Sequence, residues 1–211
     1  TITADGTFDI ATFNDTVATV SLQGGAITGT TGVLTATSAY DLRDGSVDAI
    51  LAGSVGLNKT TADTVTLSKV NTYSGVTSIT GGTLAFSAAN NLGDASATNT
   101  LTLNGGTLSY TGAGTANLVP NQAMTIGSSG ATLNISDATG ILNLQGGIVT
   151  SAAANLTKTG LGVVSVGLGG STNLNGGNVT VSAGALNAGF TASGLGAIAV
   201  SSGATLNLYD G

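Results

Sequence analysis

The residues best placed for chemistry are three aspartates close together in the chain, Asp41, Asp44 and Asp48, with Arg43 between them. Glycoside hydrolysis needs two positioned carboxylates, so this cluster is the one enzymatic alternative that the sequence offers. Enzymes that cleave polysaccharides usually also place basic groups beside the acidic ones, and the only other basic residues here are three scattered lysines. We therefore interpret the cluster as a solvated loop in which Arg43 offsets its neighbours, with little effect on stability.

Other catalytic and ligand-binding arrangements lack the residue types they need. The chain has no histidine and no cysteine, which removes Ser-His-Asp triads and imidazole or thiolate ligands. The EF-hand spacing and the Gly-Gly-x-Gly-x-Asp calcium repeat are absent, and no glycine pair continues into Gly-Lys-Ser/Thr. An isolated calcium ion between Asp41 and Asp44 stays open as an alternative. We expect no catalytic residue, metal or cofactor, and we expect Asp5, Asp9 and Asp15 to be exposed turn residues.

Composition separates this chain from several protein classes. Its 211 residues are 41% hydrophobic and 7% charged, and disordered chains have the opposite balance. The net charge of −6 offers no basic stripe for phosphates, so we expect no nucleic-acid partner. No run of apolar residues is long enough to span a bilayer. Abundant Gly, Thr, Ser and Asn with no cysteine is typical of secreted surface proteins.

Short alternating segments that break at a glycine pair recur along the chain. Residues 101–110 read LTLNGGTLSY, and related lines occupy residues 20–28, 77–86, 141–149 and 172–181. Alternation with period two predicts strands, and Gly-Gly, Asn-Gly and Ser-Gly predict corners. Recurrence at 17 to 30 residues is typical of solenoids, whose units bury their apolar faces on one another.

We predict a single-stranded parallel β-helix, right-handed, that runs continuously over residues 1–211. Coils of about 22 to 25 residues would number eight or nine, giving a rod about 40 Å long at ~4.8 Å per coil. Short Gly-rich corners, a small-residue interior and few aromatic residues favour this fold. The alternative is an antiparallel β-sandwich, because two strands flanking a glycine pair also form a hairpin.

One stretch carries a family resemblance. Residues 47–84 read VDAILAGSVGLNKTTADTVTLSKVNTYSGVTSITGGTL, which resembles the autotransporter-associated β-strand repeat (passenger-associated transport repeat) of bacterial autotransporter passenger regions. The residues that carry the motif are Gly53, Gly56, Lys59, Asn71, Thr72, Tyr73, Gly75, Gly81 and Gly82. A decayed second copy begins at Ala153 and retains Lys158 and Gly160, but it lacks the Asn-Thr-Tyr-Ser-Gly element. The copies extend over about residues 47–110 and 153–208.

The resemblance implies a non-enzymatic, exported segment. It would belong to a longer surface protein, pass through the outer membrane and be displayed or released as a stalk, an export-competent spacer or an adhesive surface. Its partners would be neighbouring coils of the parent chain or other copies, and cell-surface glycans or proteins. A self-assembling filament or surface-layer subunit is the alternative, ahead of a polysaccharide-degrading β-helix.

Three motif features invite ligand-binding interpretations, and we interpret each as structural. Lys59 and Lys158 occupy the same place in the two copies, and we expect both to project from turns and discourage edge-to-edge pairing. Tyr73 is expected to pack its ring on the coil, with its hydroxyl reaching solvent or backbone. Threonine ladders at residues 64, 66, 100 and 102 would suit an ice- or glycan-binding face only if the coils were regular.

Overall fold

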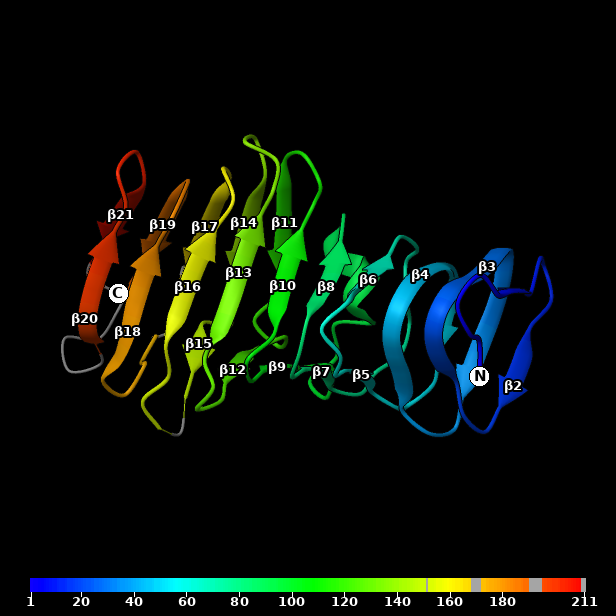
Figure 1. Ribbon diagram of the computed structural model, residues 1–211. Coiled ribbons are helices and arrows are strands. Elements are labelled where there is room, and N and C mark those ends of the chain that lie inside the picture. The colour runs from blue at the N-terminus through cyan, green and yellow to red at the C-terminus, as the bar shows by residue number, and fades with distance from the viewer. Residues whose placement is uncertain (151, 168–171, 190–194, 210–211) are drawn as a thin grey trace.

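The chain folds into an elongated stack of β-strand coils (Figure 1). The computed structural model describes residues 1–150, 152–167, 172–189 and 195–209. Its parallel strands stack in about nine coils, from β2 at the N-terminal end to β20 and β21 at the C-terminal end. Every pairing between its named strands is parallel. The predicted β-helix is confirmed, and the antiparallel sandwich is wrong because the glycine pairs turn corners between faces instead of closing hairpins.

Most coils have three faces, each formed by strands stacked in register. The first face contains β5 (Leu57–Lys59), β7 (Thr77–Ile79), β9 (Leu101–Leu103), β12 (Met124–Ile126) and β15 (Ile148–Val149). The second face contains β6 (Thr64–Leu67), β8 (Thr83–Phe86), β10 (Thr107–Tyr110), β13 (Ala131–Ile135), β16 (Leu156–Thr159), β18 (Gly177–Val181) and β20 (Leu195–Val200). The third face contains β11 (Thr115–Leu118), β14 (Ile141–Leu144), β17 (Val163–Val166), β19 (Ala185–Ala188) and β21 (Thr205–Leu208).

Two long strands unite the faces at the N-terminal end. β3 (Ser21–Ala36) pairs with β1 (Thr7–Asp9), β2 (Asp15–Val17) and β4 (Tyr40–Ala52). β4 pairs near its start with β5 and in its middle with β6, so the first and second faces diverge from this strand. The described residues contain one helical segment, the 3-10 turn η1 (Ala89–Leu92). No helix in this part of the chain is long and apolar enough to cross a membrane.

In-register stacking sorts side chains into columns along the rod. Leu84, Leu108 and Leu133 are direct neighbours on the second face and are fully buried. Hydrogen-bonded side chains in equivalent positions of adjacent coils are 20 to 26 residues apart, a wider range than predicted. The extra residues lie in the corners, so the columns stay in register while coil length varies.

Glycines at the corners let backbones of adjacent coils approach closely. Gly160 (φ 73°) and Gly176 (φ 86°) both have left-handed backbone. A Cβ built on Gly160 would lie well inside van der Waals contact with the carbonyl oxygen of Ile135 in the preceding coil, whereas one on Gly176 would meet no atom within 4 Å.

These two glycines separate the effect of backbone conformation from that of coil contact. Gly176→Ala is expected to destabilise the fold by about 1–2 kcal/mol, the strain of a left-handed alanine. Gly160→Ala should lower the free energy of unfolding by about 1–3 kcal/mol more than Gly176→Ala does, because its Cβ must displace the neighbouring coil. Urea denaturation midpoints measure both. Equal midpoints for the two variants would contradict the close contact at Gly160.

Candidate functional site

The acidic cluster lies on a strand, which corrects the expectation of a loop. Asp41 accepts hydrogen bonds from Arg43, at 2.9 Å from Nε and 2.8 Å from Nη2. Asp48 accepts a hydrogen bond of 2.8 Å from the Ser68 hydroxyl and lies 3.7 Å from Lys69 Nζ. The segment is extended because β4 continues the ladder of β3. The side chains form separate surface pairs, each contributing ~0.2–1 kcal/mol.

The remaining aspartates near the N-terminus are exposed, as predicted. Asp5 lies in a turn, whereas Asp9 and Asp15 lie within β1 and β2. Across the described ranges, no three His, Cys, Asp or Glu residues are grouped so that they could hold a metal ion.

The two repeat lysines are buried, so the expectation that they project from turns is wrong. Lys59 has no exposed surface. Its Nζ donates hydrogen bonds to the carbonyl oxygens of Thr61 (2.5 Å) and Gly81 (3.3 Å), and it also contacts the Thr61 hydroxyl (3.3 Å). Gly81 belongs to the next coil, so one ammonium group satisfies corner carbonyls of two coils.

Lys158 makes the equivalent arrangement with a different set of carbonyls. It too has no exposed surface, and its Nζ donates to the carbonyl oxygens of Thr159 (2.6 Å), Gly160 (2.8 Å) and Ala183 (3.2 Å). An ammonium group has three donors, and here each has a backbone acceptor. We call Lys59 and Lys158 with these carbonyls the lysine corners.

The lysine corners are on different faces of the solenoid. Lys59 is on the first face, where its register partner in the next coil is Ile79. Lys158 is on the second face, between Leu133 and Val181. The two repeat copies therefore share a strand–lysine–turn–strand unit, but this unit occupies different corners of the coil.

Burial lowers the pKa of both lysines, because the charged form loses hydration. For Lys59 the charges of Asp63 and Asp44 act in the opposite direction and favour the ammonium ion. For Lys158 burial alone lowers the pKa from 10.5 to about 8.

A network of buried side-chain amides replaces strand pairing in the coils that precede β11. The Asn71 side chain accepts from the Leu51 amide (2.8 Å) and donates to the Asn91 carbonyl (2.6 Å), which joins three coils. The Asn91 side chain donates to the Lys69 carbonyl (2.8 Å). The Asn99 side chain donates to the Gly75 carbonyl (3.0 Å). Each of these buried amides is bonded to backbone in another coil.

The neighbouring motif residues also contact the coil interior. Tyr73 is fully buried, and its hydroxyl bonds to the Thr77 hydroxyl at 2.8 Å instead of to solvent or backbone. Burial raises the pKa of Tyr73, and its ring centroid lies 6.3 Å from that of Tyr40. Thr72 has an exposed side chain, while its amide donates to the Leu51 carbonyl at 2.8 Å.

The motif glycines mark contacts between coils. A Cβ on Gly75 would meet the backbone of Gly56, and one on Gly56 would meet Val76. Cβ atoms on Gly81, Gly82 and Gly53 would likewise meet backbone carbonyls of the preceding coil, those of Thr60, Asp63 and Ala36. The geometry gives this set a stacking role.

An outer polar column on the third face was not recognised in the sequence. Side-chain hydrogen bonds join Asn117 to Asn143 (2.8 Å), Asn187 to Ser165 (3.4 Å) and Asn207 to Asn187 (2.8 Å). The sequence pattern that could have predicted this column is an asparagine between two apolar residues, as in segments 142–144 and 206–208. Of the threonine-ladder positions, 66 and 102 have Ala85 and Ser78 as register partners. Position 64 instead begins an in-register column of threonines on the second face, which continues through positions 83, 107, 132, 157 and 180.

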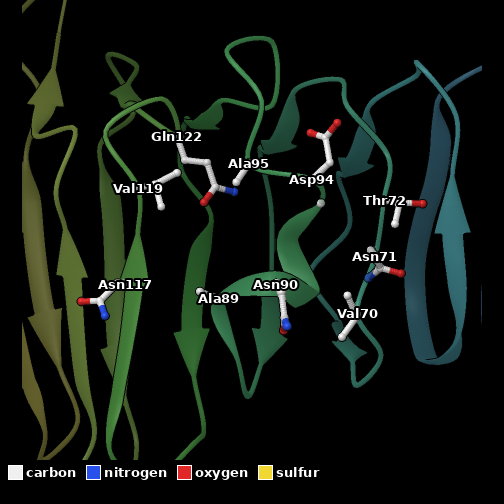
Figure 2. Close-up of a pocket in the computed structure, with 11 residues that line it drawn as sticks. Val70, Asn71, Thr72, Ala89, Asn90, Asp94, Ala95, Asn117, Val119 and Gln122 are labelled. Atoms are coloured by element: carbon white, nitrogen blue, oxygen red, sulfur yellow. The ribbon is translucent and has the colours of Figure 1, made fainter.

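The third face is hollowed where η1 replaces a strand. Figure 2 shows Val70, Asn71 and Thr72 on one side of the hollow, Asn117, Val119 and Gln122 on the other, and Ala89, Asn90, Asp94 and Ala95 between them. Its volume is about 420 Å³. Asp94 is its single titratable side chain, so the hollow lacks the paired carboxylates that glycoside hydrolysis needs.

Comparison with known proteins identifies one relevant relative. The "Adhesin BmaC autotransporter" of Brucella suis biovar 1 (strain 1330) is 36% identical to this chain over 103 residues. This stretch is 49% of the chain and 3% of the adhesin, so the chain spans a small part of that protein's length. No protein-family model matches the sequence, and no solved structure matches it.

The lysine corners predict that stability depends on pH. Below pH 8 Lys158 is protonated in both the folded and unfolded states. Between pH 8 and 10 the folded state releases this proton while the unfolded state retains it, so raising the pH stabilises the fold. Wild-type urea midpoints should therefore rise relative to those of Lys158→Met over this window. Lys69→Met, at a half-exposed lysine, is the control and should keep the wild-type rise. Parallel profiles for wild type and Lys158→Met would contradict the lowered pKa.

Proposed function

We propose that this chain is a non-enzymatic solenoid segment of an autotransporter-like surface protein, built on the autotransporter-associated β-strand repeat. The observation that carries the proposal is the 36% identity to an autotransporter adhesin, in a chain that folds as a parallel β-solenoid. The segment would be exported through the outer membrane and act at the cell surface or outside the cell. Its role would be that of a stalk or spacer within a longer protein.

The stacking contacts support this role. Each coil bonds chiefly to its immediate neighbours, so a chain emerging from a pore can add one coil at a time without distant contacts. The lysine corners, the amide network and the motif glycines all join neighbouring coils. Within the proposal, residues 1–211 are one continuous solenoid, with repeat copies near 47–110 and 153–208.

An adhesive surface is the finer alternative within the same proposal. Polar Asn and Thr side chains line the outer faces, which suits cell-surface glycans or proteins as partners. Sugar-binding platforms usually need several exposed aromatic rings, and Tyr40, Tyr73, Phe86 and Tyr110 are buried, which leaves Phe13 as the single largely exposed ring in the described residues. This favours the stalk.

Surface display tests the proposal with two adjacent residues. The chain is placed between a signal peptide and an outer-membrane translocator in a Gram-negative host, with an epitope tag between Ser202 and Gly203. Met124 faces the core of β12 and Thr125 faces solvent. We expect antibodies to label intact cells for wild type and Thr125→Asp, and several-fold less for Met124→Asp, whose buried carboxylate prevents coil closure. Retention of the wild-type chain in the periplasm, or equal display of both variants, would contradict the proposal.

Self-assembly into filaments is a second candidate, favoured by the C-terminal end of the described stack. β20 and β21 each pair on one side only, and Ile198, Val200 and Leu208 are 46%, 45% and 52% exposed. Such an edge accepts a further strand, either from a following coil of a longer parent chain or from a second copy of this chain.

Electron microscopy over a concentration series distinguishes this candidate from the spacer. Self-assembly predicts fibres that lengthen with concentration, and a lysine on the edge in Val200→Lys should suppress them. Ser201→Lys, next in the chain beyond β20, is the control. Discrete rods about 40 Å long at every concentration would contradict self-assembly.

A further inference from the structure

The hydrogen-bond ladder of the third face is interrupted within the stack. β11 is the edge strand of the five-stranded sheet and pairs only with β14. The preceding coil presents η1 on this side, and no backbone hydrogen bond joins residues 87–95 to residues 113–122, all of which the structure describes. The interruption therefore leaves one open strand edge in the middle of the rod.

The direction of the free backbone groups follows from the bonds on the other side of β11. The carbonyl oxygens of Gly114 and Leu118 accept from the amides of Ile141 (2.7 Å) and Gln145 (3.0 Å) in the β14 coil. Backbone groups alternate in direction along a strand, so those of Thr115 and Asn117 point away from β14, toward η1.

Two adjoining hollows run along this open edge. The first borders β11 at Thr115–Asn117, and the second, shown in Figure 2, extends from Asn117 to Gln122. They share Ala89, Asn90 and Asn117, and each has a volume of about 420 Å³. Together they form a groove parallel to β11, which at ~3.3 Å per residue is about 20 Å long from Ala113 to Val119.

The charged residues around the groove indicate which kind of ligand it can bind. Exposed Asp94 lines one hollow, and Tyr110 lines the other. Burial raises the pKa of Tyr110, and the nearby Asp137 carboxylate adds to this rise. No Lys or Arg lines either hollow, and the net charge of the chain is −6. An open strand edge recognises main chain, and these carboxylates favour a cation.

We propose that this groove binds an extended, lysine-containing polypeptide segment, which adds to β11 as an extra strand. The peptide main chain bonds to the free groups of Thr115 and Asn117, and its basic side chain lies near Asp94. Sugars fit less well, because the groove offers a main-chain ladder and its one aromatic ring, Tyr110, is 2% exposed. This proposal does not depend on the proposed function of the chain as a displayed stalk.

The test uses the purified full chain and the labelled probe acetyl-Thr-Val-Lys-Val-Thr-Val-amide. Fluorescence anisotropy should show saturable binding, weaker by about tenfold (~1.4 kcal/mol) when Asp replaces Lys in the probe. N-methylation of one alternate set of probe amides should abolish binding, whereas methylation of the other set should not, because only one set faces β11. Equal effects of both sets would overturn strand addition.

Protein variants locate the site. Asn90→Trp, which fills both hollows, should weaken probe binding at least about tenfold, and Asp94→Lys should weaken it several-fold. The controls are Asn58→Trp, at an exposed asparagine of β5, and Asp15→Lys, at an exposed aspartate of β2; both should bind as wild type. Equal losses in the variants and their controls would overturn the groove as the site.

Amide hydrogen exchange distinguishes probe binding in the groove at β11 from probe binding at the edge of β21. In the free chain the Asn117 amide should exchange faster than that of Leu118, and the probe should slow it by about tenfold or more. Protection of β21 amides instead would show that the probe adds to the end of the rod, and it would overturn the proposal. Failure of display in cells would leave this binding result unaffected, so the two proposals fail separately.

Discussion

Parallel, in-register stacking is the constraint on which the rest of this structure depends. Once adjacent coils share backbone hydrogen bonds, each inward side chain lies above an equivalent one, and the interior becomes a set of columns such as Leu84, Leu108 and Leu133. The corners, where strand pairing stops, must then satisfy their carbonyl groups by other means. The lysine corners and the buried Asn71 and Asn91 amides perform this task, which explains polar side chains within an apolar stack.

The strands and the fold could be predicted from local sequence because each depends on short-range pattern. Alternation in segments such as 101–110, followed by a glycine pair, specifies strand, corner and strand. The face on which a strand lies has no such local signal, since it depends on how many residues each corner absorbs. Lys59 and Lys158 illustrate this, because the same Leu-x-Lys-Thr pattern occupies the first face in one copy and the second face in the other. Their burial was also unpredictable, since a lone lysine is ordinarily a surface residue.

The hollow on the third face arises from a local loss of alternation. Residues 87–95 read SAANNLGDA, in which small and polar residues replace the apolar alternation of neighbouring coils. The Asn91 side chain accepts hydrogen bonds from the Ser87 and Ala88 amides at 3.0 and 2.9 Å, which favours the turn of η1 over a strand. The sequence therefore marks the interruption, but the open edge of β11 depends on the coil that follows and becomes visible only in the stack.

Burial of two of the chain's four basic side chains also affects how proteases can attack the folded protein. Trypsin-like proteases cleave after lysine and arginine and need the side chain to enter a deep pocket in an extended, detached segment. Lys59 and Lys158 are enclosed by carbonyl oxygens, Arg43 lies within β4 beside Asp41, and Lys69 lies near Asp48. The folded rod thus withholds Lys59 and Lys158 from such proteases, and Lys69, which is partly exposed between β6 and β7, is the basic residue that they would reach most easily.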